Sequence, residues 1–179
     1  MTTVPQPYTY AISGIPGGFN GNSSSHLFYL IETQIPTGVA PVINSDEFDV
    51  VITFDADLTT QEKATLDTLV PHSSDFFIIT KDNGTTDLGN PASISASAGL
   101  SSSTVVTLRY KAGDGTNFNG FGETIILRAP IMTIDKLSGV FDANGLFQFT
   151  IGSELNRGTV EIEVDSDSLP AKTIISSWT

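Results

Sequence analysis

The second half of this chain alternates apolar and polar residues in short runs that end at turn sequences. Residues 159–165 alternate three β-branched apolar residues with acidic ones, and residues 146–151 follow the turn Asp142-Ala143-Asn144-Gly145 with a second alternating run. A period of two is typical of a strand with one face in a core and the other in water. Asn-Gly supplies the positive backbone angles of a tight hairpin. These runs therefore predict strands of a β-sandwich.

The turn signals divide this half of the chain into a regular series of strands. We expect seven of them, at about residues 93–98, 104–111, 123–128, 132–135, 146–151, 159–165 and 172–178. Seven short strands with turns every 8–12 residues are typical of an immunoglobulin-like sandwich. We therefore predict such a domain over residues 91–179.

Residues 1–84 follow a different pattern, which predicts a small β-rich domain with a single helix. Strands are expected at residues 8–12, 26–31, 48–54 and 76–80, with a Gly- and Asn-rich loop over residues 14–25. The helix is expected at about residues 59–70, because Thr59 and Glu62 have the spacing of a capping box and Pro71 ends the run. A polar, turn-rich stretch at residues 85–91 marks the expected boundary between the two domains.

Composition excludes several kinds of function. The 179 residues carry 8 basic and 20 acidic side chains, for a net charge of −12, which argues against binding to nucleic acid or to anionic membranes. Cysteine is absent, which excludes disulfides, thiolate zinc sites and a cysteine nucleophile. The first residues lack the pattern of a signal peptide, so we expect synthesis and retention in a cytoplasm or release within a virus particle.

The strand segments also resemble a known kind of module. Residues 91–179 are similar to the bacterial immunoglobulin-like (Big or invasin-type) modules of adhesins and phage virion proteins. The similarity is carried by residues 92–96, 106–111 with 113–115, 122–127, 142–150 and 158–162. Residues 49–54 and 58–72 resemble a strand–helix unit of tailed-phage structural proteins. The resemblance implies the sandwich fold and a role as a spacer, decoration or sugar binder.

No motif in the chain points to catalysis. His26 and His72 are the only histidines, and the neighbouring Ser23-Ser24-Ser25 run is not by itself a catalytic triad. Paired oxygen ligands at Asp55 and Asp57, Asp165 and Asp167, or Asp142 and Asn144 suit calcium, but aspartate is also the usual turn residue. We therefore expect no enzymatic activity, no cofactor and no tightly bound metal.

Aromatic residues provide the candidate binding site. Phe48, Phe54, Phe147 and Phe149 are expected in the cores. Phe118 and Phe121 lie in a Gly/Asn-rich loop, where they either anchor a partner or sugar ring or fold back over the end of the sandwich. Phe19, in the first Gly-rich loop, leaves the same two alternatives open. These three are the candidate partner-binding residues.

The sequence-based hypothesis for function is a capsid decoration (cement) protein of a tailed phage. The first domain would dock on the major capsid protein, the sandwich would project from the virion exterior, and copies of the chain would form a trimer. The acidic surface fits a particle exterior. The alternative is a carbohydrate-binding or adhesin module of a tail fibre or surface protein, with Phe118, Phe121 and neighbouring Asn residues as the sugar platform. A third alternative is a glycan-processing enzyme with an unrecognised acid pair.

Overall fold

The computed structural model describes residues 5–35, 40–96, 103–129, 134–152 and 158–178. The chain divides into two compact units. The first comprises residues 1–75 and 112–116, and the second comprises residues 76–111 and 117–179. The first unit contains one sheet and the second contains two, and each unit has its own buried core.

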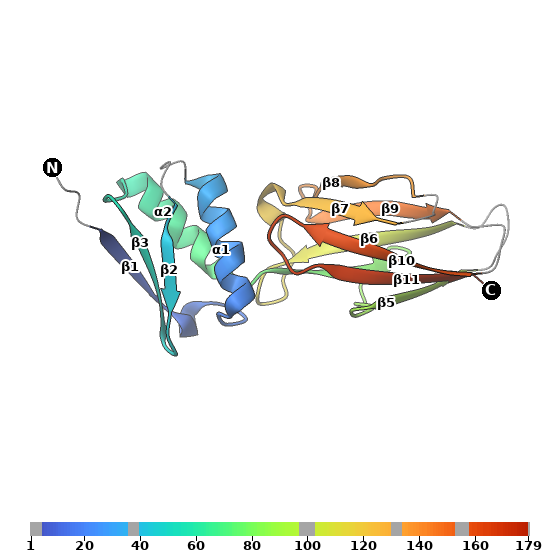
Figure 1. Cartoon of the computed structure of the whole chain (residues 1–179), viewed down its shortest axis with the longest axis horizontal. Coiled ribbons are helices and arrows are strands. Elements are labelled where there is room, and N and C mark those ends of the chain that lie inside the picture. The colour runs from blue at the N-terminus through green and yellow to red at the C-terminus, as the bar shows by residue number, and fades with distance from the viewer. Residues whose placement is uncertain (1–4, 36–39, 97–102, 130–133, 153–157, 179) are drawn as a thin grey trace. The chain divides into compact units, whose positions relative to one another are not determined.

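The first unit is a three-stranded antiparallel sheet with two helices on one face (Figure 1). Its strands are β1 (Gln6–Ala11), β2 (Val42–Ser45) and β3 (Asp49–Phe54), in the order β1-β3-β2. The helices are α1 (Gly21–Gln34) and α2 (Thr60–Leu69), and the short 3-10 turns are η1 (Ile12–Gly14) and η2 (Val70–His72). The central strand β3 supplies the middle of the core, because its alternate side chains are buried.

The predicted helix α2 is confirmed, and so is the reason for its start. Thr59 Oγ1 accepts a hydrogen bond from the backbone N–H of Glu62 at 3.3 Å, and the Glu62 carboxylate accepts one from Thr59 N–H at 2.8 Å. This reciprocal pair satisfies amides that the helix cannot pair internally. Leu66 and Leu69 then face the core.

Helix α1 takes the place of the second half of the expected loop and of the strand expected at residues 26–31, so the prediction of a single helix is wrong. Its first turn is capped by Asn20, whose Oδ1 accepts from the N–H groups of Asn22 and Ser23 at 2.9 and 3.2 Å. Leu27, Leu30 and the following Ile31 are buried at helical spacing. The cap and this 3.6-residue period outweigh the weak helix propensity of the serine run.

One of the four expected core phenylalanines lies at the surface. Phe48 is 70% exposed, whereas Phe54, Phe147 and Phe149 are buried as predicted. The Asp46 carboxylate accepts the N–H of Phe48 at 2.8 Å, which places Phe48 in the turn that precedes β3. The alternation of buried residues in β3 therefore begins at Val50 rather than at Phe48.

The second unit is a sandwich of two sheets packed face to face (Figure 1). The three-stranded sheet has the order β4-β6-β9 and the five-stranded sheet has the order β5-β11-β10-β7-β8. The strands are β4 (Phe76–Lys81), β5 (Ala92–Ala96), β6 (Ser103–Lys111), β7 (Thr124–Arg128), β8 (Ser138–Val140), β9 (Leu146–Gly152), β10 (Gly158–Ser166) and β11 (Lys172–Trp178).

This strand order is immunoglobulin-like. The strands β4, β6 and β9 take the positions of A, B and E in one sheet, and β7, β10 and β11 take those of C, F and G in the other. The inner faces form one continuous apolar core, in which Tyr110, Phe149 and Ile162 have at most 1% of their surface exposed. The predicted fold class, mainly β with an immunoglobulin-like sandwich, is confirmed.

The chain divides earlier than the expected boundary at residues 85–91. Strand β4 pairs antiparallel with β6, from Phe76 opposite Lys111 to Lys81 opposite Val106, so it belongs to the sandwich. The turn after β4, closed by a 2.8 Å hydrogen bond from Gly84 N–H to the Lys81 carbonyl, lies within that unit. The N-terminal segment of the first unit therefore ends at Asp75.

The strand expected at residues 132–135 lies partly outside the described residues. Of that stretch, Ile134 forms an isolated bridge with Ile151 of β9. The strand observed nearby is β8, which pairs with β7 at the edge of the five-stranded sheet.

A buried carboxylate connects two loops of the sandwich. Glu123, directly before β7, is fully buried. Its oxygens accept hydrogen bonds from the Ser168 N–H and hydroxyl at 2.8 and 3.0 Å, from Leu169 N–H at 3.4 Å and from the Ser166 hydroxyl. A buried carboxylate is tolerated because these donors replace water. Glu123 thus fixes the connection between β10 and β11.

Candidate functional site

Two loops meet at one end of the sandwich, the segment Asn117–Gly122 before β7 and the turn Asp142–Gly145 before β9. The Gly145 carbonyl accepts the Tyr110 N–H at 2.8 Å, and the Tyr110 carbonyl accepts the Phe118 N–H at 3.5 Å. A Cβ on Gly145 would lie 1.8 Å from the Phe118 carbonyl oxygen. Only glycine permits this close approach, so the two loops form a single surface.

The turn is shaped by its own carboxylate. Asp142 Oδ1 accepts the backbone N–H groups of Asn144 and Leu146 at 2.8 and 2.9 Å. Gly145 has a φ of +69°, which completes the hairpin turn. The Asp142 carboxylate therefore stabilises the turn. The Asn144 side chain is exposed at this end of the sandwich.

Phe118 and Phe121, which the sequence singled out, lie together. Their ring centroids are 4.8 Å apart, and the Phe118 ring lies 6.2 Å from that of Tyr110. Both phenylalanines are half-buried, and Phe118 also packs on the sandwich core. Phe118 therefore folds back over the end of the core, and both rings keep part of their surface exposed.

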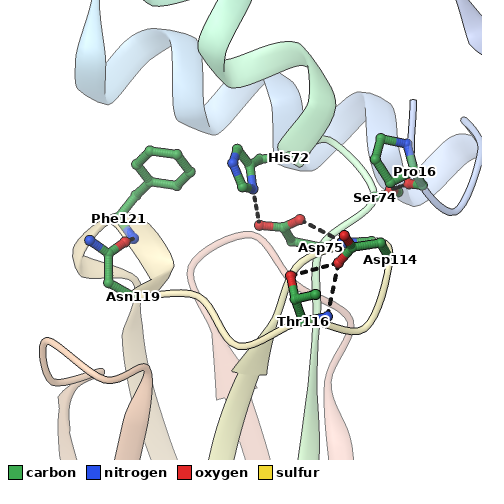
Figure 2. A network of polar contacts seen from close by, with 9 residues as sticks. Pro16, His72, Ser74, Asp75, Asp114, Thr116, Asn119 and Phe121 are labelled. Atoms are coloured by element: carbon green, nitrogen blue, oxygen red, sulfur yellow. Dashed lines mark hydrogen bonds and ion pairs between the residues drawn. The ribbon is translucent and has the colours of Figure 1, made fainter. Parts of the chain in front are cut away.

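The backbone at Phe121 adopts an unusual conformation. Its φ is +49°, between Gly120 at +76° and Gly122 at +81°. A bulky residue in the left-handed region costs about 1–3 kcal/mol, and such strain gathers at binding and catalytic sites. Asn119 supports the conformation, because its Oδ1 accepts the Phe121 N–H at 3.2 Å (Figure 2).

A cavity of about 350 Å³ opens beside this aromatic pair. It is lined by Asn117, Phe118, Asn119, Ala143 and Asn144. Three amide side chains next to an aromatic ring combine directional hydrogen bonding with an apolar face, which is the usual chemistry of small-ligand pockets. This cavity is the candidate site.

The third candidate residue is Phe19. It belongs to the first unit, where it is half-buried and directly precedes the cap residue of α1, Asn20. Its position within the unit is that of a residue leading into a helix rather than the tip of a long loop.

A second, larger cavity lies on the outer face of the five-stranded sheet. It measures about 660 Å³ and is lined by Leu127, Arg128, Ala129, Leu137, Glu161, Glu163 and Thr173. Arg128 reaches Asp165 at 2.6 Å and Glu163 at 3.6 Å, so its charge is neutralised within the sheet. This cavity was not predicted from the sequence, in which the outward acidic residues Glu161 and Glu163 of β10 were the available signal.

The first unit contains a polar network around the end of α2 (Figure 2). His72 Nδ1 lies 3.0 Å from Asp75 Oδ2, and Asp75 Oδ1 accepts the Gly113 N–H at 3.0 Å. The Ser74 hydroxyl donates to the Pro16 carbonyl. These bonds hold residues 112–116 within the first unit, which gives His72 and Asp75 a structural role.

His26 is buried in α1, with 1% of its surface exposed. Burial, and secondarily the charge of His72, lowers the pKa of His26 from 6.5 to about 4. The imidazole is therefore neutral near pH 7. The neighbouring Ser23 hydroxyl accepts the Asn20 N–H at 3.1 Å as part of the helix cap.

Three of the candidate calcium ligands, Asp142, Asp165 and Asp167, are engaged in turns or ion pairs. Asp165 pairs with Arg128, and Asp167 accepts the Thr124 N–H at 3.3 Å. Among the residues that the structure describes, no three His, Asp or Glu side chains gather where they could hold a metal ion. None of the helices in the described ranges is both long and apolar enough to span a bilayer.

The comparisons with known proteins find only distant similarity. No family model matches the chain, and no curated protein matches it. Similar solved structures include the D00–D0 domains of intimin (11% identity, TM-score 0.40, 85% of this chain and 82% of that one) and the D0–D1 domains of intimin (10%, 0.41, 99% and 82%). Another is WR4, a C. elegans MSP family member (9%, 0.40, 57% and 98%). With TM-scores below 0.5, these similarities carry no functional information about this chain.

Proposed function

We propose that this protein is a non-catalytic, immunoglobulin-like recognition module of a surface structure that binds carbohydrate at the end of its sandwich. The observation that carries the proposal is the cavity lined by Asn117, Phe118, Asn119, Ala143 and Asn144. It unites the aromatic and amide residues that carbohydrate recognition requires.

A sugar offers two kinds of contact to a protein. Its C–H groups pack on an aromatic ring, and its hydroxyls exchange hydrogen bonds with planar amides. Phe118 supplies the ring, and the three Asn side chains supply the amides. The strained backbone at Phe121 supports the same proposal, since the fold maintains that conformation beside the cavity.

Decoration of a phage particle is the second candidate. In that role the first unit would bind the major capsid protein, and copies of the chain would assemble as trimers on the virion exterior. Its support is the sequence resemblance and the net charge of −12. The cavity favours the recognition module over decoration, because a purely structural cement protein has no need of a ligand site.

A glycan array with the full chain tests the proposed function. The variant Phe118→Leu removes the ring while keeping an apolar side chain on the core, and it should lose the array signal of the wild-type protein. Phe48→Leu is the matched control, because Phe48 is 70% exposed in the other unit. Retention of full binding by Phe118→Leu, or absence of any bound glycan, would refute the proposal. Hundreds of copies over a phage head would instead support decoration.

A further inference from the structure

We infer that the cavity at the end of the sandwich recognises a neutral N-acetylated sugar, with the acetamido carbonyl accepting hydrogen bonds from the side-chain NH₂ groups of Asn117 and Asn119. The inference rests on the proposed function and specifies its ligand class. It follows from the orientation of the two amides.

The orientation of each amide is fixed by a neighbour that can only donate. The Lys111 ammonium lies 2.7 Å from one side-chain atom of Asn117, and the Phe121 N–H lies 3.2 Å from one of Asn119. An ammonium and a backbone N–H have no acceptor capacity, so both of these atoms must be carbonyl oxygens.

The opposite ends of these amides are therefore NH₂ groups. Over the described part of the chain, neither nitrogen donates a hydrogen bond, and both side chains are exposed and line the cavity. Figure 2 shows the Asn119 amide with its oxygen toward the Phe121 backbone nitrogen. Each NH₂ carries two donors, so this wall of the cavity presents donors to a ligand.

A cavity wall lined by N–H donors favours ligands that supply hydrogen-bond acceptors. A sugar hydroxyl both donates and accepts, and therefore gains no preference here over water. An acetamido carbonyl only accepts, and its two lone pairs can take one N–H from each Asn. The methyl group of the same acetamido can pack on Phe118 and Ala143, which form the apolar part of the lining.

A carboxylated sugar would also supply acceptors, but the local charge disfavours it. The Asp142 carboxylate lies in the turn that carries Ala143 and Asn144, and the chain has a net charge of −12. The Lys111 ammonium, which donates to Asn117 Oδ1, keeps its positive charge but offsets only one of these negative charges. Repulsion from the like charges therefore favours a neutral acceptor.

Replacement of Asn by Asp tests this orientation directly. Asp keeps the acceptor oxygen that Lys111 or Phe121 N–H requires, and it exchanges the NH₂ group for a second acceptor. The hydrogen bonds from the Lys111 ammonium and the Phe121 N–H should therefore survive, which thermal unfolding and circular dichroism would verify. Asn44→Asp, at an exposed position of β2 in the first unit, controls for the added negative charge.

The experiment measures binding of chitotriose, which is N-acetylated, and cellotriose, which is not, to the full chain by isothermal titration calorimetry. We expect wild type and Asn44→Asp to prefer chitotriose, and Asn117→Asp and Asn119→Asp each to lose affinity for it by about tenfold or more. Cellotriose binding should change little in any variant.

The outcomes separate this inference from the proposed function. Equal affinity for both sugars, or an equal loss for both in the Asp variants, would overturn the donor-wall inference while leaving carbohydrate binding intact. Binding to carboxylated glycans in preference to chitotriose would overturn it as well. Absence of binding to any glycan would refute the proposed function itself, and the inference with it.

Discussion

Acidification should weaken the first unit through His26, whose imidazole is buried in α1. Its pKa is about 4 in the folded protein, against 6.5 for an unperturbed histidine. The unfolded chain therefore binds more protons than the folded one between these two pH values. The contribution of His26 to stability is complete above pH 6.5 and decreases as the pH falls toward 4.

The size of the effect follows from the two pKa values. Linkage gives a loss of about 2 kcal/mol in the free energy of unfolding between pH 7.5 and pH 5.0 for this one group. That is a substantial fraction of the stability of a small domain. The dominant cause is desolvation, because charging the imidazole within the core removes it from water.

Urea unfolding at the two pH values, followed by ellipticity at 222 nm, measures the effect. Among the described residues, both α-helices belong to the first unit, so this signal reports on that unit. His26→Gln removes the titrating group while keeping a polar side chain, and its pH-dependent loss should be smaller by about 2 kcal/mol. Equal losses in wild type and His26→Gln would refute the reasoning, because the pH dependence would then arise from other groups.

Further substitutions test how the loops and caps are held. Glu123→Ala should lower the free energy of unfolding in urea by about 3 kcal/mol, because it leaves buried donors without a partner; a loss under about 1 kcal/mol would mean that water replaces the carboxylate. Gly145→Ala should lower the free energy of unfolding by more than about 3 kcal/mol, because its Cβ would meet the Phe118 carbonyl. Gly115→Ala should lower it by only about 1–2 kcal/mol, because Gly115 has a φ of +84° but open space around it. Similar losses for the two would contradict the steric explanation. Asn20→Ala should destabilise α1 by about 1 kcal/mol, measured by hydrogen exchange of its amides, and unchanged exchange would exclude Asn20 as the cap.

Local patterns predicted those elements whose signals are contained in a few neighbouring residues. Helix α2 was predictable because its capping box and apolar stripe lie within one short segment. Helix α1 was missed because the apolar run His26–Ile31 suits either a strand or a helix, and three serines precede it. The signal that distinguishes them is the spacing of Leu27, Leu30 and Ile31 after a capping Asn20.

Features that depend on pairing between distant residues were not predictable from local patterns. Strand β4 was recognised as a strand, but only its pairing with β6, some 30 residues away, assigns it to the sandwich. The candidate site follows the same rule. Phe118 and Phe121 were visible as aromatics in a Gly/Asn loop, whereas the close approach of this loop to the distant turn at Gly145 was not.

The parallel pairing of β5 with β11 has a mechanical consequence. The pairs run from Ala92–Ile174 to Ala96–Trp178, so the start of β5 and the end of β11 lie at opposite ends of this ladder. A pulling force applied to those two ends acts along the strands and loads all of their hydrogen bonds in shear at once. An antiparallel pair pulled from adjacent ends would instead break its hydrogen bonds one after another. The sandwich is therefore built to resist tension along the β5–β11 ladder.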